Sequence, residues 1–343
     1  MNAQSSPAKC SSFADSRDPM TTVQPTTAAA PPGYEETLRA LAEKDDRVVV
    51  LTAENRAAIR SLPPILGKRF IDVGICEQTM IGVAAGLSLR GRRPVCHALA
   101  TFLTLRAYEF IRDDLGIPSL PAVLLGGVPG FLSDANGPTH QAIDDVSLMR
   151  TIPNVRVFCP ADERELAEAL PLLLNDDHPW YVRHIAMPPA FEHTAKVEIG
   201  KAEVILDGDE IGILSYGLTA RESYGAAKAL EAKGHSVRFV NMRSLKPIDE
   251  AAVLDTVSKC KVTFTVEDHL LTGGLFSIVA ELCAKNACWP GKALLGGGRS
   301  PGRLIPFALD ERWFLPTLLK DVLEHEGFNA AKLCERITRS LNA

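Results

Sequence analysis

The sequence lacks the features that would place the protein in a membrane, around zinc or on nucleic acid. Its 343 residues contain no apolar run of about 18 residues, the length that a membrane span needs. The eight cysteines are scattered without a CxxC pair, which predicts reduced core thiols and no zinc site. A net charge of −5 leaves no basic excess for nucleic acid. No GxGxxG follows the first predicted strand and no P-loop is present, which argues against a generic nucleotide-binding protein.

The first 33 residues are predicted to be a disordered tail. They are rich in Ser, Thr, Ala and Pro and cannot bury enough apolar surface to offset the entropy of ordering. They also lack the apolar core of a secretory signal. Asp15, Asp18 and a single arginine argue against a transit peptide, and either Met1 or Met20 could be the start. We therefore expect a cytoplasmic protein.

The remaining chain predicts an α/β protein with two doubly wound domains, because short apolar runs alternate with helical patterns. The predicted strands are 48–52, 70–73, 94–98, 122–125, 155–158 and 180–183, then 211–215, 237–241 and 262–266. The predicted helices are 77–89, 105–113, 161–174, 220–233, 249–260, 275–284 and 330–341. We expect domains at 34–190 and 201–343, a linker at 191–200, and a loop rich in Gly and Pro at 290–306.

Two motifs stand where predicted strands end. In the first, residues 72–78 lead from a strand through a tight turn to Glu77, at the start of a helix with small residues. An isolated acidic residue there is ordinarily explained by the helix dipole. In the second, His140 lies in a loop with Gly and Pro after a strand, where α/β sheets bind ligands. A lone loop histidine is more often structural, so neither motif decides the function by itself.

Taken together and in chain order, these two motifs and several further segments resemble the C-terminal half of transketolases, and specifically the C-terminal subunit of split transketolases. The resemblance is carried by residues 75–78, 101–102 with Tyr108, 137–141, 241–249, 266–269 and 273–275. It implies a pyrimidine-binding domain with the thiamine-diphosphate fold, followed by a transketolase C-terminal domain. It also implies a transferase that moves a two-carbon ketol, or a related acyl-anion unit, to an aldehyde acceptor.

The resemblance implies thiamine diphosphate with Mg²⁺ as cofactors and assigns roles to four residues. Glu77 would hydrogen-bond the pyrimidine nitrogen N1′ and favour the imino form that removes the C2 proton. Phe102 and Tyr108 would provide an apolar slot for the pyrimidine, with ordinary helix packing as the alternative. His140 would contact the substrate and move a proton.

Four positions complete the expected site, and three of them depart from the family. Leu105 replaces a second phenylalanine of the cofactor slot, Asn136 replaces a substrate-binding aspartate, and Val128 replaces a substrate-binding histidine. Arg183 stands in the place of an arginine that binds a substrate phosphate, with a salt bridge at a strand end as its alternative. The lost polar contacts predict a substrate other than the usual pentose phosphates.

The Gly-Asp-Gly motif that holds the metal and diphosphate in this family is absent. Residues 207–209 contain Asp-Gly-Asp instead, which we interpret as a turn. Because Mg²⁺ needs hard oxygen ligands, we expect an N-terminal partner subunit that carries Gly-Asp-Gly. Two such pairs would form an α2β2 heterotetramer acting on a ketose or ketoacid donor and an aldehyde acceptor.

Two other functions remain open at this point. The beta subunit of a 2-oxoacid dehydrogenase has the same domain pair and cofactor glutamate, although the loop at 137–141 favours transketolase. A non-catalytic assembly subunit is the other, and the presence of Glu77 and His140 argues against it.

Overall fold

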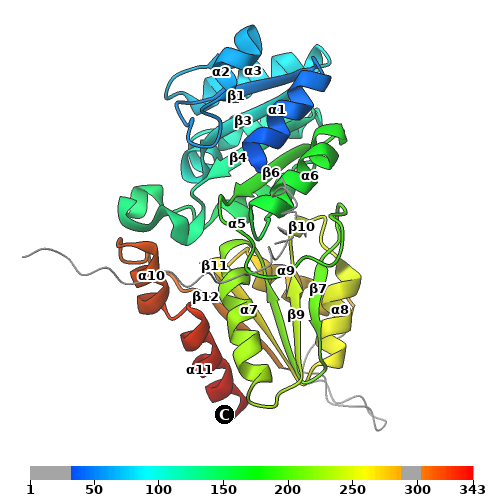
Figure 1. Cartoon of the computed structure of the whole chain (residues 1–343), viewed down its shortest axis with the longest axis vertical. Helices are drawn as coiled ribbons and strands as arrows, with labels where there is room; N and C mark the ends of the chain where they lie inside the picture. The colour runs from blue at the N-terminus through cyan, green and yellow to red at the C-terminus, as the bar shows by residue number, and fades with distance from the viewer. Residues whose placement is uncertain (1–31, 287–302, 343) are drawn as a thin grey trace, which may run out of the picture. The chain divides into compact units, whose positions relative to one another are not determined.

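The computed structural model describes residues 32–286 and 303–342 and is built on two β-sheets (Figure 1). The first sheet has seven strands in the order β10-β5-β6-β4-β3-β1-β2, and the second has five in the order β12-β11-β8-β9-β7. Within each sheet most neighbours are parallel, so the expected doubly wound α/β class is confirmed. Residues 1–31 of the predicted tail and most of the predicted loop at 290–306 lie outside the described residues.

The strands are β1 Val48–Thr52, β2 Phe70–Asp72, β3 Arg93–Leu99, β4 Ala122–Gly127, β5 Arg156–Phe158, β6 Pro179–His184, β7 Glu203–Asp207, β8 Ile211–Ser215, β9 Val237–Asn241, β10 Ser244–Lys246, β11 Val262–Leu270 and β12 Arg303–Leu309. The α-helices are α1 Tyr34–Lys44, α2 Leu62–Leu66, α3 Glu77–Leu89, α4 Tyr108–Phe110, α5 Asp145–Thr151, α6 Glu163–Asn175, α7 Gly217–Glu231, α8 Glu250–Lys259, α9 Leu275–Lys285, α10 Leu319–Glu326 and α11 Ala330–Leu341. None of the described helices is long and apolar enough to cross a membrane.

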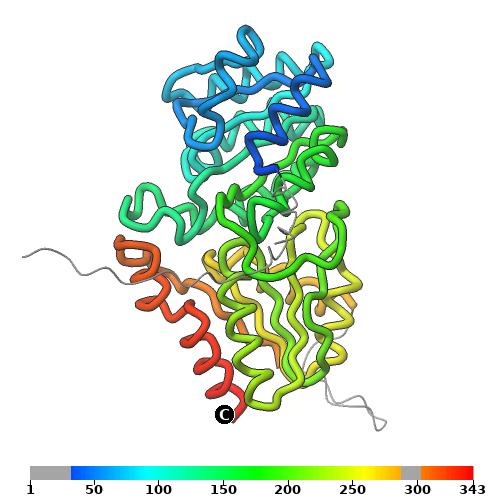
Figure 2. The backbone as a smooth tube through the Cα atoms, viewed as in Figure 1, coloured from blue at the N-terminus to red at the C-terminus, as the bar shows by residue number. Residues whose placement is uncertain are grey.

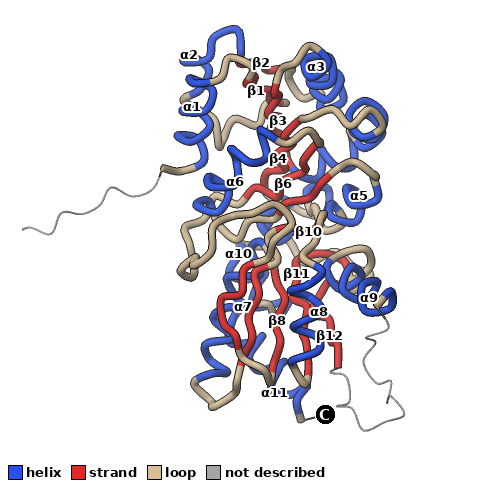
Figure 3. The backbone as a smooth tube through the Cα atoms, turned by 90° about the vertical axis from the view of Figure 1, so that its right-hand side faces the viewer, coloured by secondary structure: helices blue, strands red, loops and turns tan. Residues whose placement is uncertain are grey.

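Helices cover both faces of the first sheet because its central strands carry apolar residues on both sides. Along β1, Val48 and Val50 belong to the cluster under α1 and α6. Val49 and Leu51, which point the opposite way, belong to the cluster under α3 and α5. Figure 3 shows these two helix pairs on opposite sides of the sheet. The arrangement leaves the carboxyl ends of the parallel strands at one edge, where loops can build a site.

The second half of the chain contributes a strand to the first sheet. β10 pairs antiparallel with β5, although it follows β9 of the second sheet. Between β6 and β7 the chain contains no helix or strand, which is the region where the sequence predicts a linker. A third connection is made by η4 (Gly130–Asn136), a 3-10 segment after β4 that packs against α10 (Figure 2). The two blocks are therefore joined by side-chain and main-chain contacts as well as by the linker.

The structure differs from two of the predicted local elements and confirms a third. The predicted helix at 105–113 is two π-helical segments, Phe102–Arg106 and Ile111–Gly116, that flank α4. The last part of the predicted loop at 290–306 belongs to β12. The predicted turn at 207–209 is confirmed, since β7 ends at Asp207 and β8 begins at Ile211.

Candidate active site

Glu77 is a buried carboxylate at the first residue of α3. The turn before it depends on Gly74, whose φ of +73° suits glycine and whose N–H donates to the Asp72 carboxylate at 2.9 Å. Glu77 is only 2% exposed. Its Oε2 accepts a hydrogen bond from Nη1 of Arg106 at 2.8 Å. The turn after β2 thus places the Glu77 carboxylate in a position that is shielded from solvent.

Arg106 links Glu77 to two other predicted site residues. Its guanidinium lies 4.4 Å from the centre of the Phe102 ring, and the Phe102 ring meets the His140 ring edge-on at 5.0 Å. Glu77 and Phe102 come from separate segments and both contact the Arg106 guanidinium, while His140, from a third segment, contacts Phe102. The sequence analysis did not identify Arg106. Its spacing of four residues from Phe102 on a helical segment was the available signal.

Three exposed apolar side chains belong to the segments that carry Glu77 and Arg106, and we call them the apolar rim. Ile75, two residues before Glu77, is 70% exposed, Leu105, next to Arg106, is 48% exposed, and Phe110 in α4 is 39% exposed. Grouped apolar exposure of this kind typically marks a surface that another protein covers. Tyr108 has a different environment from Leu105, because its half-buried side chain hydrogen-bonds Thr151 of α5 at 2.9 Å.

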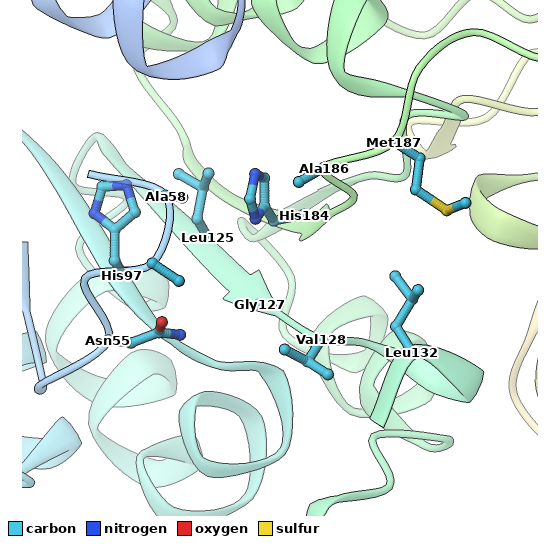
Figure 4. Close-up of a pocket in the computed structure, with 11 residues that line it drawn as sticks. Asn55, Ala58, His97, Leu125, Gly127, Val128, Leu132, His184, Ala186 and Met187 are labelled. Atoms are coloured by element: carbon cyan, nitrogen blue, oxygen red, sulfur yellow. The ribbon is translucent and has the colours of Figure 1, made fainter. Parts of the chain in front are cut away.

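A cavity of about 290 Å³ opens at the carboxyl ends of the strands of the first sheet (Figure 4). Its wall is mostly apolar and is formed by residues after β1, within β3 and β4, and at the ends of β4 and β6. The lining residues are Asn55, Ala57, Ala58, His97, Leu125, Gly127, Val128, Leu132, His184, Ala186 and Met187. None of these lining residues is a lysine or arginine, so the cavity wall carries no fixed positive charge.

The two histidines of the cavity are neutral at physiological pH. Burial lowers the pKa of His97 to about 3 and that of His184 to about 4. The Tyr34 hydroxyl donates to Nε2 of His97 at 2.7 Å, while Nδ1 of His97 donates to the Leu51 carbonyl at 3.2 Å. The sequence analysis missed both histidines because each belongs to a strand, and only the sheet order brings β3 and β6 to one cavity.

Val128 and Asn136 occupy different parts of the loop after β4. Val128 lines the cavity and has a φ of +58°, a strained conformation for a β-branched residue. Asn136 is exposed, and its amide donates to the Ser133 carbonyl at 2.9 Å. The structure therefore turns Val128 into the cavity and folds the Asn136 side chain back on its own loop.

Arg183 is engaged inside the protein and is not presented to a ligand. It is 1% exposed, and its guanidinium donates to Asp145 at 2.9 Å and to Asp268 at 2.6 Å. Burial by itself lowers the pKa of Arg183, but the adjacent Asp145 and Asp268 carboxylates outweigh it and hold that pKa well above the ordinary value. The Arg183 guanidinium is thus paired with two carboxylates and does not line the cavity, a geometry that matches the salt bridge given as the alternative to a contact with a substrate phosphate.

One group of potential metal ligands occurs among residues 32–286 and 303–342, formed by Glu165, His193 and Glu203. His193 bridges Asp162 and Glu203 at 2.7 Å on each ring nitrogen, and these carboxylates raise its pKa to about 10. Arg243 adds a second cation 3.2 Å from Glu165. In this structure the charged His193 and Arg243 neutralise the surrounding carboxylates, so the cluster is a network of ion pairs.

Two family models match the chain. The pyrimidine-binding domain of transketolase matches residues 26–185, and the transketolase C-terminal domain matches residues 200–295. The 6-deoxy-6-sulfo-D-fructose transketolase subunit SqwH of Clostridium sp. (strain MSTE9) is 34% identical over 261 residues, which cover 75% of this chain and 81% of that subunit. The chain belongs to the transketolase family. It is a transketolase-like transferase subunit that corresponds to the C-terminal subunit of a split transketolase.

Other transketolase-family proteins show how much of a full-length enzyme this chain represents. The 1-deoxy-D-xylulose-5-phosphate synthase of Synechococcus sp. (strain JA-3-3Ab) is 33% identical over 93% of this chain, which spans 49% of the synthase. A solved split-gene transketolase, an inactive beta4 tetramer, superposes with a TM-score of 0.77 at 29% identity, covering 90% of this chain and 97% of that one. These matches favour the transketolase family over a 2-oxoacid dehydrogenase.

Proposed function

We propose that this chain forms, with an N-terminal partner subunit, a cytoplasmic transketolase-like enzyme that uses thiamine diphosphate and Mg²⁺ for carboligation. The observation that carries the proposal is the buried carboxylate of Glu77 beside an exposed apolar rim. The family resemblance supports thiamine diphosphate, and the SqwH and split-gene relatives support a second subunit. An α2β2 assembly would give each of two sites one partner contribution.

The residues around Glu77 suit an aminopyrimidine ring. Such a ring needs a hydrogen-bonding carboxylate shielded from water and an aromatic surface, and Glu77 and Phe102 can provide both. Thiamine diphosphate supplies, when bound, the reactive carbon that carries the transferred two-carbon unit. Glu77 would hold a proton at the pyrimidine edge, while Phe102 and Leu105 would keep water from that edge, with Tyr108 supporting the slot from behind.

The metal and diphosphate ligands are expected on the partner. The described His193 cluster is filled by its own ion pairs, so it leaves no open set of oxygen ligands for Mg²⁺. The Gly-Asp-Gly motif is absent from the whole sequence. Ile75, Leu105 and Phe110 supply the apolar surface against which a partner could complete the site.

His140 and the cavity at Val128 define the proposed substrate side. His140 would donate or accept a proton at the substrate carbonyl or hydroxyl, held by its contact with Phe102. Val128, with the neutral His97 and His184, gives this chain's wall apolar surface and uncharged hydrogen-bonding groups. We therefore propose a ketose or ketoacid donor and an aldehyde acceptor that differ from the usual pentose phosphates, with Asn136 as a further substrate contact.

The test is steady-state kinetics of the chain reconstituted with its Gly-Asp-Gly partner. The donor panel contains xylulose 5-phosphate, 6-deoxy-6-sulfo-D-fructose and pyruvate, and the acceptor panel contains ribose 5-phosphate and small unphosphorylated aldehydes. We expect poor use of the pentose phosphates and improvement in Val128→His. If wild type used xylulose 5-phosphate and ribose 5-phosphate with a kcat/KM of about 10⁴ M⁻¹s⁻¹ or more, our interpretation of Val128 and Asn136 would be wrong.

A further inference from the structure

The segment that carries Asn136 and His140 is held at both of its ends by one buried ion pair. We call residues 130–142 the His140 loop. At its start, the Phe131 N–H donates to Oδ2 of Asp268 at 3.2 Å. At its end, the Ala142 carbonyl accepts from Nη2 of Arg183 at 3.3 Å. Because Arg183 and Asp268 are themselves 2.6 Å apart, one pair spans both ends of the loop.

The backbone at Gly130 is shaped to receive this pair. Gly130 has a φ of +54°, and its N–H donates to the Ala142 carbonyl at 3.0 Å, which closes the base of the loop. A Cβ atom at this position would lie 1.9 Å from Oδ2 of Asp268 and 2.8 Å from Nη2 of Arg183. Only glycine can therefore bring the loop base against the ion pair.

The second block supplies further contacts to the same loop and the residue after it. The Leu270 N–H donates to the Ile143 carbonyl at 2.7 Å, and the Gln141 side chain donates to the Phe314 carbonyl at 2.8 Å. The middle of the loop, in contrast, makes local bonds such as the one from Asn136 to Ser133. The second block thus contacts both ends of the loop, and His140, two residues before Ala142, meets the Phe102 ring edge-on.

We propose that Asp268, acting through Arg183, is a positioning residue that sets the place of His140 for the substrate. The inference rests on the proposed function and extends it, because it gives the C-terminal domain a role in the acceptor side of the site. Buried charges are costly unless fully paired, and this pair also makes hydrogen bonds to both ends of the His140 loop. Asp145 holds Arg183 from the opposite side through Nε and also accepts from the Tyr181 hydroxyl.

Hydrogen–deuterium exchange of the full chain tests whether the Arg183–Asp268 pair holds the His140 loop in place. We call this contact the anchor, and the test needs no assumption about activity. Asp268→Asn replaces one acceptor by an amide N–H, which would face a donor from Phe131 or Arg183. We expect exchange in the His140 loop to accelerate roughly 10-fold or more. Arg183→Lys keeps the positive charge but loses the several N–H donors of the guanidinium, so the exchange rate of the His140 loop should rise less than in Asp268→Asn. If Asp268→Asn does not fold, Arg183→Lys provides the test.

The matched control is Arg243→Lys. Arg243 is equally buried at 1% exposure and also joins the two blocks, but its other bonds go to the Lys196 and Lys201 carbonyls. It should lower the melting temperature and leave exchange in the His140 loop unchanged. The anchor would be wrong if exchange in the His140 loop accelerated equally in Arg243→Lys and Asp268→Asn. It would also be wrong if that exchange did not accelerate in Asp268→Asn or in Arg183→Lys.

Kinetics of the reconstituted complex then test positioning. Asp268→Asn should lower kcat/KM for the acceptor by about 10²-fold, because small misplacements have effects of that size, and should leave the dissociation constant of thiamine diphosphate unchanged. An altered loop with wild-type acceptor kinetics would contradict the positioning role. If wild type is inactive while the exchange results hold, the proposed function fails and the anchor stands.

Discussion

Buried charge occurs in two settings in this protein, and their difference separates scaffold from site. Arg183 and Arg243 are each 1% exposed and have ion-pair and hydrogen-bond partners on several sides. Glu77 is as deeply buried, at 2% exposure, yet its one ion pair is to Arg106, whose side chain is 38% exposed, and an exposed apolar rim lies beside it.

The comparison indicates which part of the molecule is expected to contact a partner subunit. A buried arginine whose guanidinium is paired on several sides has its partners within the chain. An exposed apolar edge next to a buried carboxylate is, in contrast, a surface that another protein typically covers. We therefore assign Glu77 to chemistry shared with a partner, the Arg243 cluster to stability, and the Arg183 pair to the control of a loop.

The strongest way to sharpen the contrast is Glu77→Gln. The amide fills the same space but cannot exchange a proton as a carboxylate does, so turnover of the reconstituted complex should fall by about 10²–10⁴-fold. Melting temperature should change little. Glu109→Gln, an exposed neighbour on α4, is the control and should keep wild-type turnover. A Glu77→Gln rate within about threefold of wild type would make Glu77 an ordinary helix-start residue.

Mutation of the ion-pair cluster around His193 should instead lower stability and leave turnover unchanged. His193 is charged between Asp162 and Glu203, with Glu165 and Arg243 close by. His193→Gln should lower the free energy of unfolding by about 3–5 kcal/mol near neutral pH and leave kcat unchanged, since it breaks a buried ion pair. His178→Gln, which removes a half-exposed histidine paired with Asp176, should have a much smaller effect.

The pH dependence of that loss has a definite sign. The pKa of His193 rises from 6.5 in the unfolded chain to about 10 in the fold. Its stabilisation is therefore fully present below pH 6.5 and is lost as the pH rises through about 10. Chemical denaturation of wild type and His193→Gln at several pH values should show the two stabilities converging toward pH 10. A difference that grew with pH would contradict the charged state of His193.

The rim should matter less than either buried group. Ile75→Asp should weaken association with the partner subunit by about 10-fold, because it places a charge in a surface that we expect to be covered. Leu89→Asp is the matched control, since Leu89 ends α3, the helix that begins two residues after Ile75, and is also 70% exposed. Equal affinities of both variants in sedimentation or titration experiments would remove the rim from the interface.

Periodicity predicted most strands because it is a local property, whereas Glu77, His140 and Arg183 were singled out through the resemblance to transketolases. The sequence did not predict that β10 would join the first sheet, since three residues after a strand carry no signal of a distant partner. It also gave no sign of the pairing of Arg183 with Asp268, which lies 85 positions away. His97 and His184 were invisible as a pair, because only the strand order places them at one cavity.

Calorimetry of thiamine diphosphate and Mg²⁺ tests the central claim most directly. The account predicts no micromolar binding by this chain alone, because Glu77 and Phe102 can hold only the pyrimidine end and the Gly-Asp-Gly ligands are absent. Binding should appear when a subunit with Gly-Asp-Gly is added, and should weaken again when that aspartate is replaced by alanine. Micromolar cofactor binding by the isolated chain would contradict the shared site.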